Sequence, residues 1–308
     1  GDRQDVGERF RLVGVNRRIV REAVEAGLLE ERMGLRIFGG SARPIVRALA
    51  YTTDPYLPGI TGDEAGALSF LRGIGIEPAP GGQQRTLGDL SKEELKRLAS
   101  ELVKLLLRAG YSAREAERVY GATYTILSEQ PDSPLRDARE YAQLLNACGR
   151  VGSFEVAIAL GLGVRGEMVL RALNVAGQYR SLLARALRSV REEGLMRDEG
   201  RIALADLRGR DFVSDRLSGA IASLLLPYVR GEKLLVVAVD SPDGVKVSVR
   251  RGDGPPVPVG ELLSRAARLV GGVGGGHERA GGATVPAGRF EEFLSALKRE
   301  LGLAAERG

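Results

Sequence analysis

The chain of 308 residues contains no tryptophan, one cysteine and one histidine, and only 5% of its residues are aromatic. The single cysteine, Cys148, excludes an internal disulfide framework and a cysteine-based zinc cluster, and we interpret it as a small core residue. Few rings are present on which nucleic-acid bases could stack, with Tyr51, Tyr56 and Phe212 as the candidates. Contacts to backbone phosphates are therefore the more economical expectation for any nucleic-acid ligand.

No apolar run approaches the roughly 18 residues that a membrane-spanning helix needs. We find no signal peptide, so the sequence predicts a cytoplasmic protein without a membrane partner. It also has no P-loop motif and no Gly-x-Ser-x-Gly elbow, which excludes the usual nucleotide-binding loop and the usual serine hydrolase. Gly161 to Gly166 has the spacing of a dinucleotide fingerprint, but its flanks look helical and Ser181 to Arg191 contains no acid. We interpret it as a glycine turn between helices.

The charge of the chain is modest and basic, with a net value of +5 and a pI near 9.5. Such a balance is compatible with a polyanionic partner. Six of the 45 basic residues are lysines, which leaves 39 arginines, and the guanidinium fork pairs bidentately with phosphate oxygens. A GC-rich or heat-adapted genome is the alternative explanation for the arginines.

The C-terminal part has the pattern of a small α/β domain. Leu234 to Val239 is an apolar run, a Ser-Pro-Asp-Gly turn follows, and Val245 to Arg250 alternates in the two-residue period of a half-exposed strand. These features predict a β-hairpin that carries Lys246, Ser248 and Arg250 on one face. Helical spacing follows from Val259 to Val270 and again from Arg289 to Leu303.

The preceding part is rich in helical patterns, so we expect a mixed α/β fold with a helix-rich N-terminal region and a smaller C-terminal α/β domain with a mixed sheet. We place domain boundaries to give residues 1–85, a helical region 86–194 with a long linker helix, and residues 195–308. Glu77 to Gly82 reads as a linker. Predicted helices in the middle region run from a capping box at Ser91 to Arg108, from Ser112 to Glu129, from Leu135 to Ala147, and over residues 167–193.

The only histidine, His277, stands within a glycine-rich run over residues 272–286. Glycine removes the Cβ atom and permits positive φ, so several backbone N–H groups can turn toward one anion while His277 adds a donor. This combination predicts a phosphate-binding site. A mobile glycine-rich loop with an exposed histidine is the alternative.

The order Val-Ser-Val-Arg250, a helix, and then Gly-Gly-Gly-His277-Glu-Arg-Ala-Gly-Gly-Ala-Thr-Val-Pro resembles the substrate-binding domain that accompanies the DHH phosphoesterase domain. The resemblance implies that His277 and Arg250 hold a phosphate of a nucleic acid or nucleotide. Gly274, Gly275, Gly276 and Arg279 complete the predicted phosphate-binding set. Gly281 departs from the family pattern, where alanine is frequent, but either residue is small.

The opening Gly-Asp-Arg-Gln-Asp, which lacks an initiator Met, resembles the end of the fourth DHH motif in archaeal RecJ-like proteins, and this likeness would make Asp2 a metal ligand. A solvated acidic terminus is the alternative. Similarity to archaeal RecJ-like nucleases continues through Thr53 to Asp63 and Leu135 to Gly149. The earlier Asp-x-Asp and Asp-His-His motifs are absent. The complete family enzyme is expected to use Mn²⁺ or Mg²⁺, whereas this chain has too few metal ligands to hydrolyse phosphodiesters by itself.

Three functions remain open at this point. The resemblance favours the strand-binding portion of a RecJ-like exonuclease, with single-stranded DNA or RNA as partner. A non-catalytic replication adaptor that associates with the GINS complex is the second, with the helical region 86–150 as its docking surface. The binding part of a DHH enzyme for short oligonucleotides or cyclic dinucleotides is the third.

Overall fold

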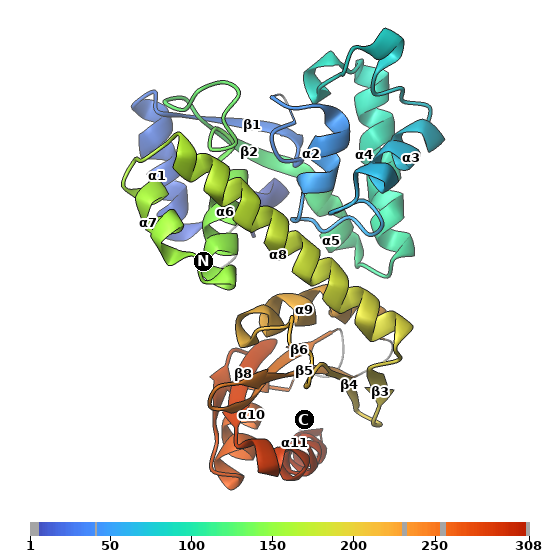
Figure 1. Ribbon diagram of the computed structural model, residues 1–308, viewed down its shortest axis with the longest axis vertical. Coiled ribbons are helices and arrows are strands. Elements are labelled where there is room, and N and C mark those ends of the chain that lie inside the picture. Colours follow the sequence, from blue (N-terminus) through green and yellow to red (C-terminus); the bar gives the residue numbers. More distant parts are fainter. Residues whose placement is uncertain (1–5, 41, 230–232, 253–256, 306–308) are drawn as a thin grey trace. The chain divides into compact units, whose positions relative to one another are not determined.

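The computed structural model describes residues 6–40, 42–229, 233–252 and 257–305, with side chains through Gly302. The chain divides into two compact units, Gly1–Arg180 and Ser181–Gly308. Figure 1 shows their helices and strands. Among the described residues, no helix is both long enough and apolar enough to cross a membrane.

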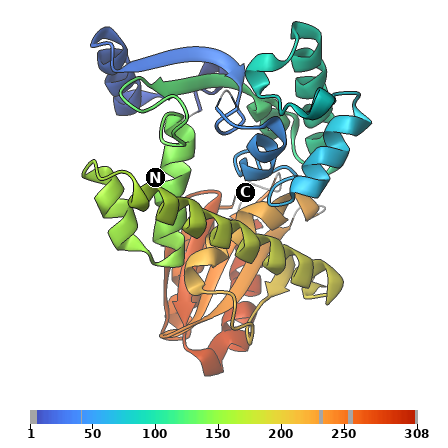
Figure 2. The same cartoon turned by 45° about the horizontal axis from the view of Figure 1, so that its top comes forward.

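Unit 1 consists mainly of helices, as the sequence predicts, with a two-stranded antiparallel ribbon of β1 and β2, which Figure 2 shows in blue and green. Its apolar core lies between α2, α3 and α4 and includes Leu49, Leu71 and Leu102. The elements of this unit are α1 (Gly14–Glu25), β1 (Leu29–Leu35), α2 (Ile45–Tyr51), α3 (Glu64–Gly73), α4 (Lys92–Arg108), α5 (Ala113–Ala116), β2 (Tyr120–Ile126), α6 (Ala138–Val151), α7 (Phe154–Gly161) and the first part of α8 (Glu167–Glu192).

The helix predicted from Ser112 to Glu129 is wrong in its second half. Only the short α5 forms, and the chain then enters β2, where Tyr120 to Ile126 pairs with Leu35 to Leu29. Three of the seven residues of β2 are β-branched, a composition that favours a strand when a partner is present. That partner, β1, lies far away in the sequence, so tertiary pairing overrides the local helical pattern.

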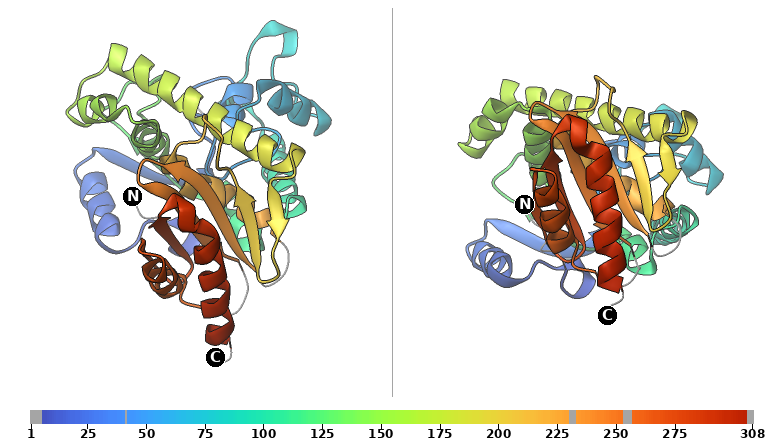
Figure 3. Two further views of the ribbon diagram at one scale, coloured as in Figure 1. Left: turned by 60° about the horizontal axis from the view of Figure 1, so that its bottom comes forward. Right: turned by 90° about the horizontal axis from the view of Figure 1, so that it is seen from below.

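Unit 2 is built on one six-stranded mixed sheet of order β3-β4-β5-β6-β8-β7, in which β4 and β5 are parallel and the other pairs antiparallel. Figure 3 shows α10 and α11 on one face of this sheet. The predicted hairpin and the two predicted C-terminal helices are confirmed. The elements are β3 (Met196–Asp198), β4 (Ile202–Asp206), α9 (Ser218–Leu225), β5 (Leu234–Ser241), β6 (Gly244–Arg251), α10 (Val259–Leu269), β7 (Val273–Gly276), β8 (Ala280–Val285) and α11 (Phe290–Ala305).

The core of unit 2 lies between the sheet and the pair α10 and α11. Val247 on β6, Leu263 on α10 and Phe293 on α11 are each 0% exposed, and they belong to one apolar cluster. Burial of this kind stabilises by about 25 cal/mol for each Å² of apolar surface removed from water. The opposite face of the sheet is covered in part by α9, which contacts β5 and β6. The core therefore fixes the strands from one side and leaves β7 and β8 accessible from the other.

Candidate phosphate-binding site

Strand β6 presents two different faces, because successive side chains of a strand point to opposite sides. Val245, Val247 and Val249 are at most 1% exposed and belong to the core with α10 and α11. Lys246, Ser248 and Arg250 lie on the other face, as the alternation in the sequence predicts. Functional side chains of β6 are therefore directed away from the core and toward the side of α9.

Arg250 makes three hydrogen bonds, two of them to α9 and one to its own strand. Its guanidinium donates to the Gly219 carbonyl at 3.1 Å, to the Ser223 hydroxyl at 3.3 Å and to the Val249 carbonyl at 2.9 Å. Beside it, the hydroxyls of Ser248 and Ser218 lie 2.9 Å apart. These contacts fix the guanidinium at one end of the β6 face, which is the preorganisation that a charged binding group requires.

The glycine-rich run, predicted as a loop, is instead a β-hairpin of β7 and β8. Gly274 is paired with Ala283, Gly275 with Gly282 and Gly276 with Gly281. Glycine is unfavourable in strands, but ladder hydrogen bonds to β8 and close packing against α10 compensate. The local composition is typical of a loop, but the tertiary contacts of this run stabilise a strand.

His277 and Arg250 lie on either side of Ala280. The N–H of His277 donates to the Ala280 carbonyl at 2.8 Å, and Ala280 is the register partner of Arg250 on the next strand. His277 directly follows β7, and its backbone lies opposite Ala280 at the turn of the hairpin. Two strand spacings, about 10 Å, separate the backbones of His277 and Arg250. His277 is exposed and Arg250 is partly exposed.

The turn that carries His277 caps helix α10. The N–H of Gly260 donates to the His277 carbonyl at 3.0 Å, and the N–H of Val259 donates to the Glu278 carbonyl at 3.2 Å. These two amides would otherwise be open donors at the helix N-terminus. They are already bonded within the protein and are therefore not open to an external anion.

The glycines of the hairpin fall into two groups. A Cβ atom on Gly274 would lie 2.6 Å from the Leu263 carbonyl oxygen, and one on Gly281 would lie 2.6 Å from a Leu263 methyl group. Those two residues must be glycine so that the hairpin can pack on α10. A Cβ atom on Gly275 would meet nothing within 4 Å, and one on Gly282 would meet only the Val247 carbonyl oxygen at 3.4 Å.

Gly275 and Gly282 are neighbours on the face of Arg250, and packing within the protein does not require either of them to lack a side chain. We call the surface formed by Val273, Gly275, Ala280, Gly282 and Thr284 the open face. Val273 is 78% exposed, and the other four residues are partly exposed. At Gly275 and Gly282, the absence of a side chain lets another molecule approach the backbone closely.

Arg279 and Asp2 are the two predicted site residues that remain to be placed. Arg279 lies in the turn, where its guanidinium donates to the Gly252 carbonyl at 3.2 Å. Asp2 lies outside the described residues. Within the described part of the chain, no three His, Cys, Asp or Glu side chains gather in a way that could hold a metal ion. The described residues therefore do not fit a two-metal centre of the kind that hydrolyses phosphodiesters.

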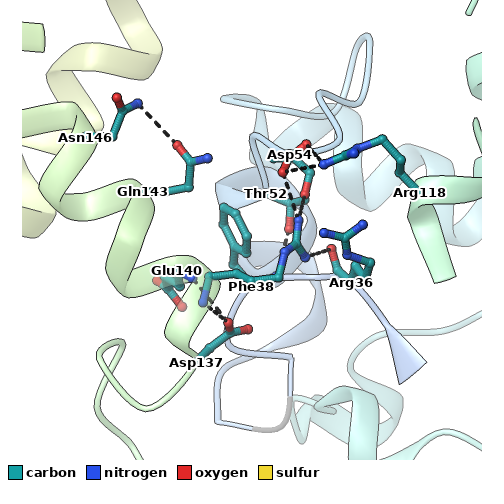
Figure 4. A network of polar contacts seen from close by, with 10 residues as sticks. Arg36, Phe38, Thr52, Asp54, Arg118, Asp137, Glu140, Gln143 and Asn146 are labelled. Atoms are coloured by element: carbon teal, nitrogen blue, oxygen red, sulfur yellow. Dashed lines mark hydrogen bonds and ion pairs between the residues drawn. The ribbon is translucent and has the colours of Figure 1, made fainter. Parts of the chain in front are cut away.

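Unit 1 contains a buried network that sequence reasoning missed. The carboxylate of Asp54 accepts hydrogen bonds from Arg118 at 3.2 Å and from Arg139 at 3.1 Å (Figure 4). Arg139 also donates to the Arg36 carbonyl at 3.3 Å, and its guanidinium lies 5.3 Å from the ring centroid of Phe38. Because all three polar side chains are nearly buried, we interpret the network as a connection between the 3₁₀ turn before β2, α6 and the loop after α2.

Glu140 on α6 is a second buried group of unit 1. Its Oε1 atom accepts from Arg43 at 2.6 Å, while its buried Oε2 atom has no hydrogen-bond partner. Burial raises the pKa of Glu140 to about 7, although the charge of Arg43 acts in the opposite direction.

A groove of about 740 Å³ lies beside β1, β2 and α4 and is lined in part by Lys92, Lys96 and Arg136. None of the predicted site residues lines that groove.

The fold is an α/β unit in which β6 presents Lys246, Ser248 and Arg250 on one face, preceded by a helix-rich unit. Comparison with known proteins assigns both parts: residues 202–302 match the DHHA1 domain, and residues 37–120 match the DHH-CID domain. The chain therefore contains domains of the DHH group, which confirms the resemblance of the C-terminal half.

The segment Gly161 to Gly166 joins two helices, α7 and α8, and follows no strand, as expected for a glycine turn.

Relatives in other organisms extend over most of the chain. A functionally uncharacterized protein of Methanocaldococcus jannaschii is 27% identical over 295 residues, which is 94% of this chain and 60% of the relative. The crystal structure of CDC45 from Entamoeba histolytica has a TM-score of 0.49 at 11% identity and covers 89% of this chain and 58% of that chain. RecJ of Thermus thermophilus in complex with Mg²⁺ has a TM-score of 0.43 at 19% identity, with coverages of 80% and 35%. The chain thus spans about three fifths of the length of its curated relative.

Proposed function

We propose that this chain is the strand-binding portion of a RecJ-like DHH exonuclease and that it holds single-stranded DNA or RNA by its phosphates. The observation that carries the proposal is the position of His277 and Arg250 on either side of Ala280, at the edge of a face that carries no bulky side chains. A guanidinium and an imidazole are both phosphate donors, and charge-assisted hydrogen bonds are the stronger kind.

We infer further that the polypeptide binds a strand without cutting it. Hydrolysis through two metal ions needs several carboxylates and imidazoles that converge, and the described residues offer no such group. Mn²⁺ or Mg²⁺ would belong to the complete family enzyme. Release of nucleotides from a 5′-labelled or 3′-labelled strand by this purified chain with Mn²⁺ would contradict the inference.

The decisive experiment measures the affinity of the full chain for a fluorescent single-stranded oligonucleotide at several salt concentrations. We expect weak binding that decreases steeply with salt, because phosphate contacts release counterions. His277→Ala and Arg250→Ala should each weaken binding by about 1 to 3 kcal/mol. Arg299→Ala is the matched control, since Arg299 is an exposed residue of α11, on the other side of the sheet. Unchanged affinity in both site variants would refute the proposal.

A protein-docking role is the second candidate, and one observation favours it. Phe154 and Ile158 of α7 and Leu162, which caps its C-terminus, follow each other at four-residue steps and are 49%, 61% and 80% exposed. An exposed apolar stripe of this kind is typical of a surface that binds another protein. Purified GINS is the partner to test, with Ile158→Glu as the variant. Binding of GINS that Ile158→Glu abolishes, together with no affinity for single strands, would favour this role.

A further inference from the structure

Lysine is rare in this chain, and two of its six lysines line the groove beside β1, β2 and α4. Lys92 and Lys96 lie four residues apart on α4, so their side chains are neighbours on one side of the helix. Arg136, in the segment between β2 and α6, adds a third cation to the lining. All described lining residues belong to unit 1.

The two lysines are not neutralised by acids of the protein. Lys104, on the same helix, pairs with Glu101 at 2.7 Å. Among the described residues, no acid forms an ion pair with Lys92 or Lys96, and both lysines are exposed. The positive charges on this side of α4 are therefore available to an anionic ligand.

The one acid of the described lining is already engaged. The Oδ1 atom of Asp137 accepts from the N–H groups of Arg139 at 2.9 Å and Glu140 at 3.2 Å, at the N-terminus of α6 (Figure 4). A carboxylate is stabilised at such a helix end. Arg136 donates to the backbone carbonyl of Glu129, an acceptor without a net charge. The groove is therefore cationic on balance.

The rest of the lining defines the size and the apolar character of the groove. Its volume of about 740 Å³ lies in the range of sites for small organic molecules, roughly 300 to 1,000 Å³. Backbone hydrogen bonds join its walls: the N–H of Leu87 donates to the Gly40 carbonyl at 2.7 Å, and the N–H of Ile126 donates to the Arg136 carbonyl at 2.8 Å. Apolar surface is contributed by Met33, Leu35, Ile37, Leu87, Leu95 and Tyr120.

From these observations we propose that the groove binds a small amphiphilic organic anion. Its carboxylate or phosphate group lies at Lys92 and Lys96, and its apolar chain or ring lies against the apolar lining. An ammonium group binds an anion as a compact point charge, so both head groups suit the two lysines. The volume and the fixed walls favour a small molecule over a segment of a partner protein. The inference is independent of the proposed function.

The test uses the full chain and the fluorescent anion anilinonaphthalene sulfonate as a probe. We expect saturable binding of the probe and its displacement by decanoate and by decyl phosphate. Decanol, which has the same chain without a charge, should displace it at least about tenfold more weakly. The ratio between decanoate and decyl phosphate tells which head group is preferred. Displacement by decanol as effective as that by decanoate would refute the role of the lysines.

Two kinds of variant test the two parts of the site. Lys92→Ala and Lys96→Ala should each weaken the binding of decanoate about fivefold, and Lys96→Arg should bind like the wild type. Ala99→Trp fills the groove without a change of charge and should abolish binding of the probe. Lys104→Ala is the matched control, because Lys104 lies on the same helix but not in the lining.

Three results would overturn the proposal. The first is wild-type affinity in both lysine-to-alanine variants, and the second is unchanged binding of the probe by Ala99→Trp. The third is displacement of the probe by polyglutamate but by neither amphiphile, which would assign the groove to an acidic segment of a partner protein. Circular dichroism and urea unfolding establish that each variant is folded.

Discussion

His277 and Arg250 share one neighbour, Ala280, although they come from different strands and lie 27 positions apart in the sequence. Under the proposed function, Ala280 is the floor beneath the phosphate that the site binds. Ala280→Asp should place a carboxylate where the phosphate would lie, and the repulsion between like charges should reduce affinity for a single strand by at least about tenfold. Fluorescence anisotropy measures this change. Ala287→Asp, an exposed position outside the face, should bind like the wild type.

Two adjacent glycines should respond oppositely to the same substitution. Gly274→Ala introduces a Cβ atom 2.6 Å from the backbone oxygen of Leu263 and should destabilise the protein by about 1 to 3 kcal/mol. Gly275→Ala meets no atom within 4 Å, so its stability should be unchanged or slightly higher. Its affinity for a strand should nevertheless fall. Urea titration and binding assays on both variants separate the two effects; equal losses of stability would show that the grouping of the glycines is mistaken.

Asp54 should be important for the stability of unit 1. Asp54→Ala leaves Arg118 and Arg139 nearly buried without the carboxylate that accepts from both, and a loss of about 3 kcal/mol in unfolding free energy is expected. Glu292→Ala breaks the solvent-exposed pair with Arg289 and should change the stability little. Thermal or urea unfolding provides the comparison. Similar losses in the two variants would argue against a structural role of the Asp54 network.

Glu140 should make stability depend on pH in a direction that is unusual for a carboxyl group. Its pKa is about 7 in the folded protein, above the ordinary value of 4.5, so the folded state binds the proton more tightly than the unfolded state. The stabilisation is fully present below the unfolded value and is lost as pH rises to about 7, at most about 3 kcal/mol. Unfolding free energies of the wild type and Glu140→Gln between these pH values measure it. A constant difference between the two proteins would exclude the effect.

The sequence predicted the structure well wherever side chains follow the two-residue repeat of a strand or the three- to four-residue repeat of a helix. The alternation from Val245 to Arg250 predicted both the strand and the common face of Lys246, Ser248 and Arg250, and the apolar spacing predicted α10 and α11. The opposite roles of Gly274 and Gly275 were not predictable, because they depend on which side of the hairpin α10 packs against. The same reason applies to Asp54, whose partners Arg118 and Arg139 are 64 and 85 positions away.

The capping of α10 by the carbonyls of His277 and Glu278 ties recognition to folding. The turn provides acceptors for the first two amides of α10, and the N-terminus of α10 in return holds the backbone of the turn. Mutations that loosen α10 from within the core, far from any ligand, should therefore impair ligand capture as well. The turn of the hairpin and the first turn of α10 therefore form one structural unit.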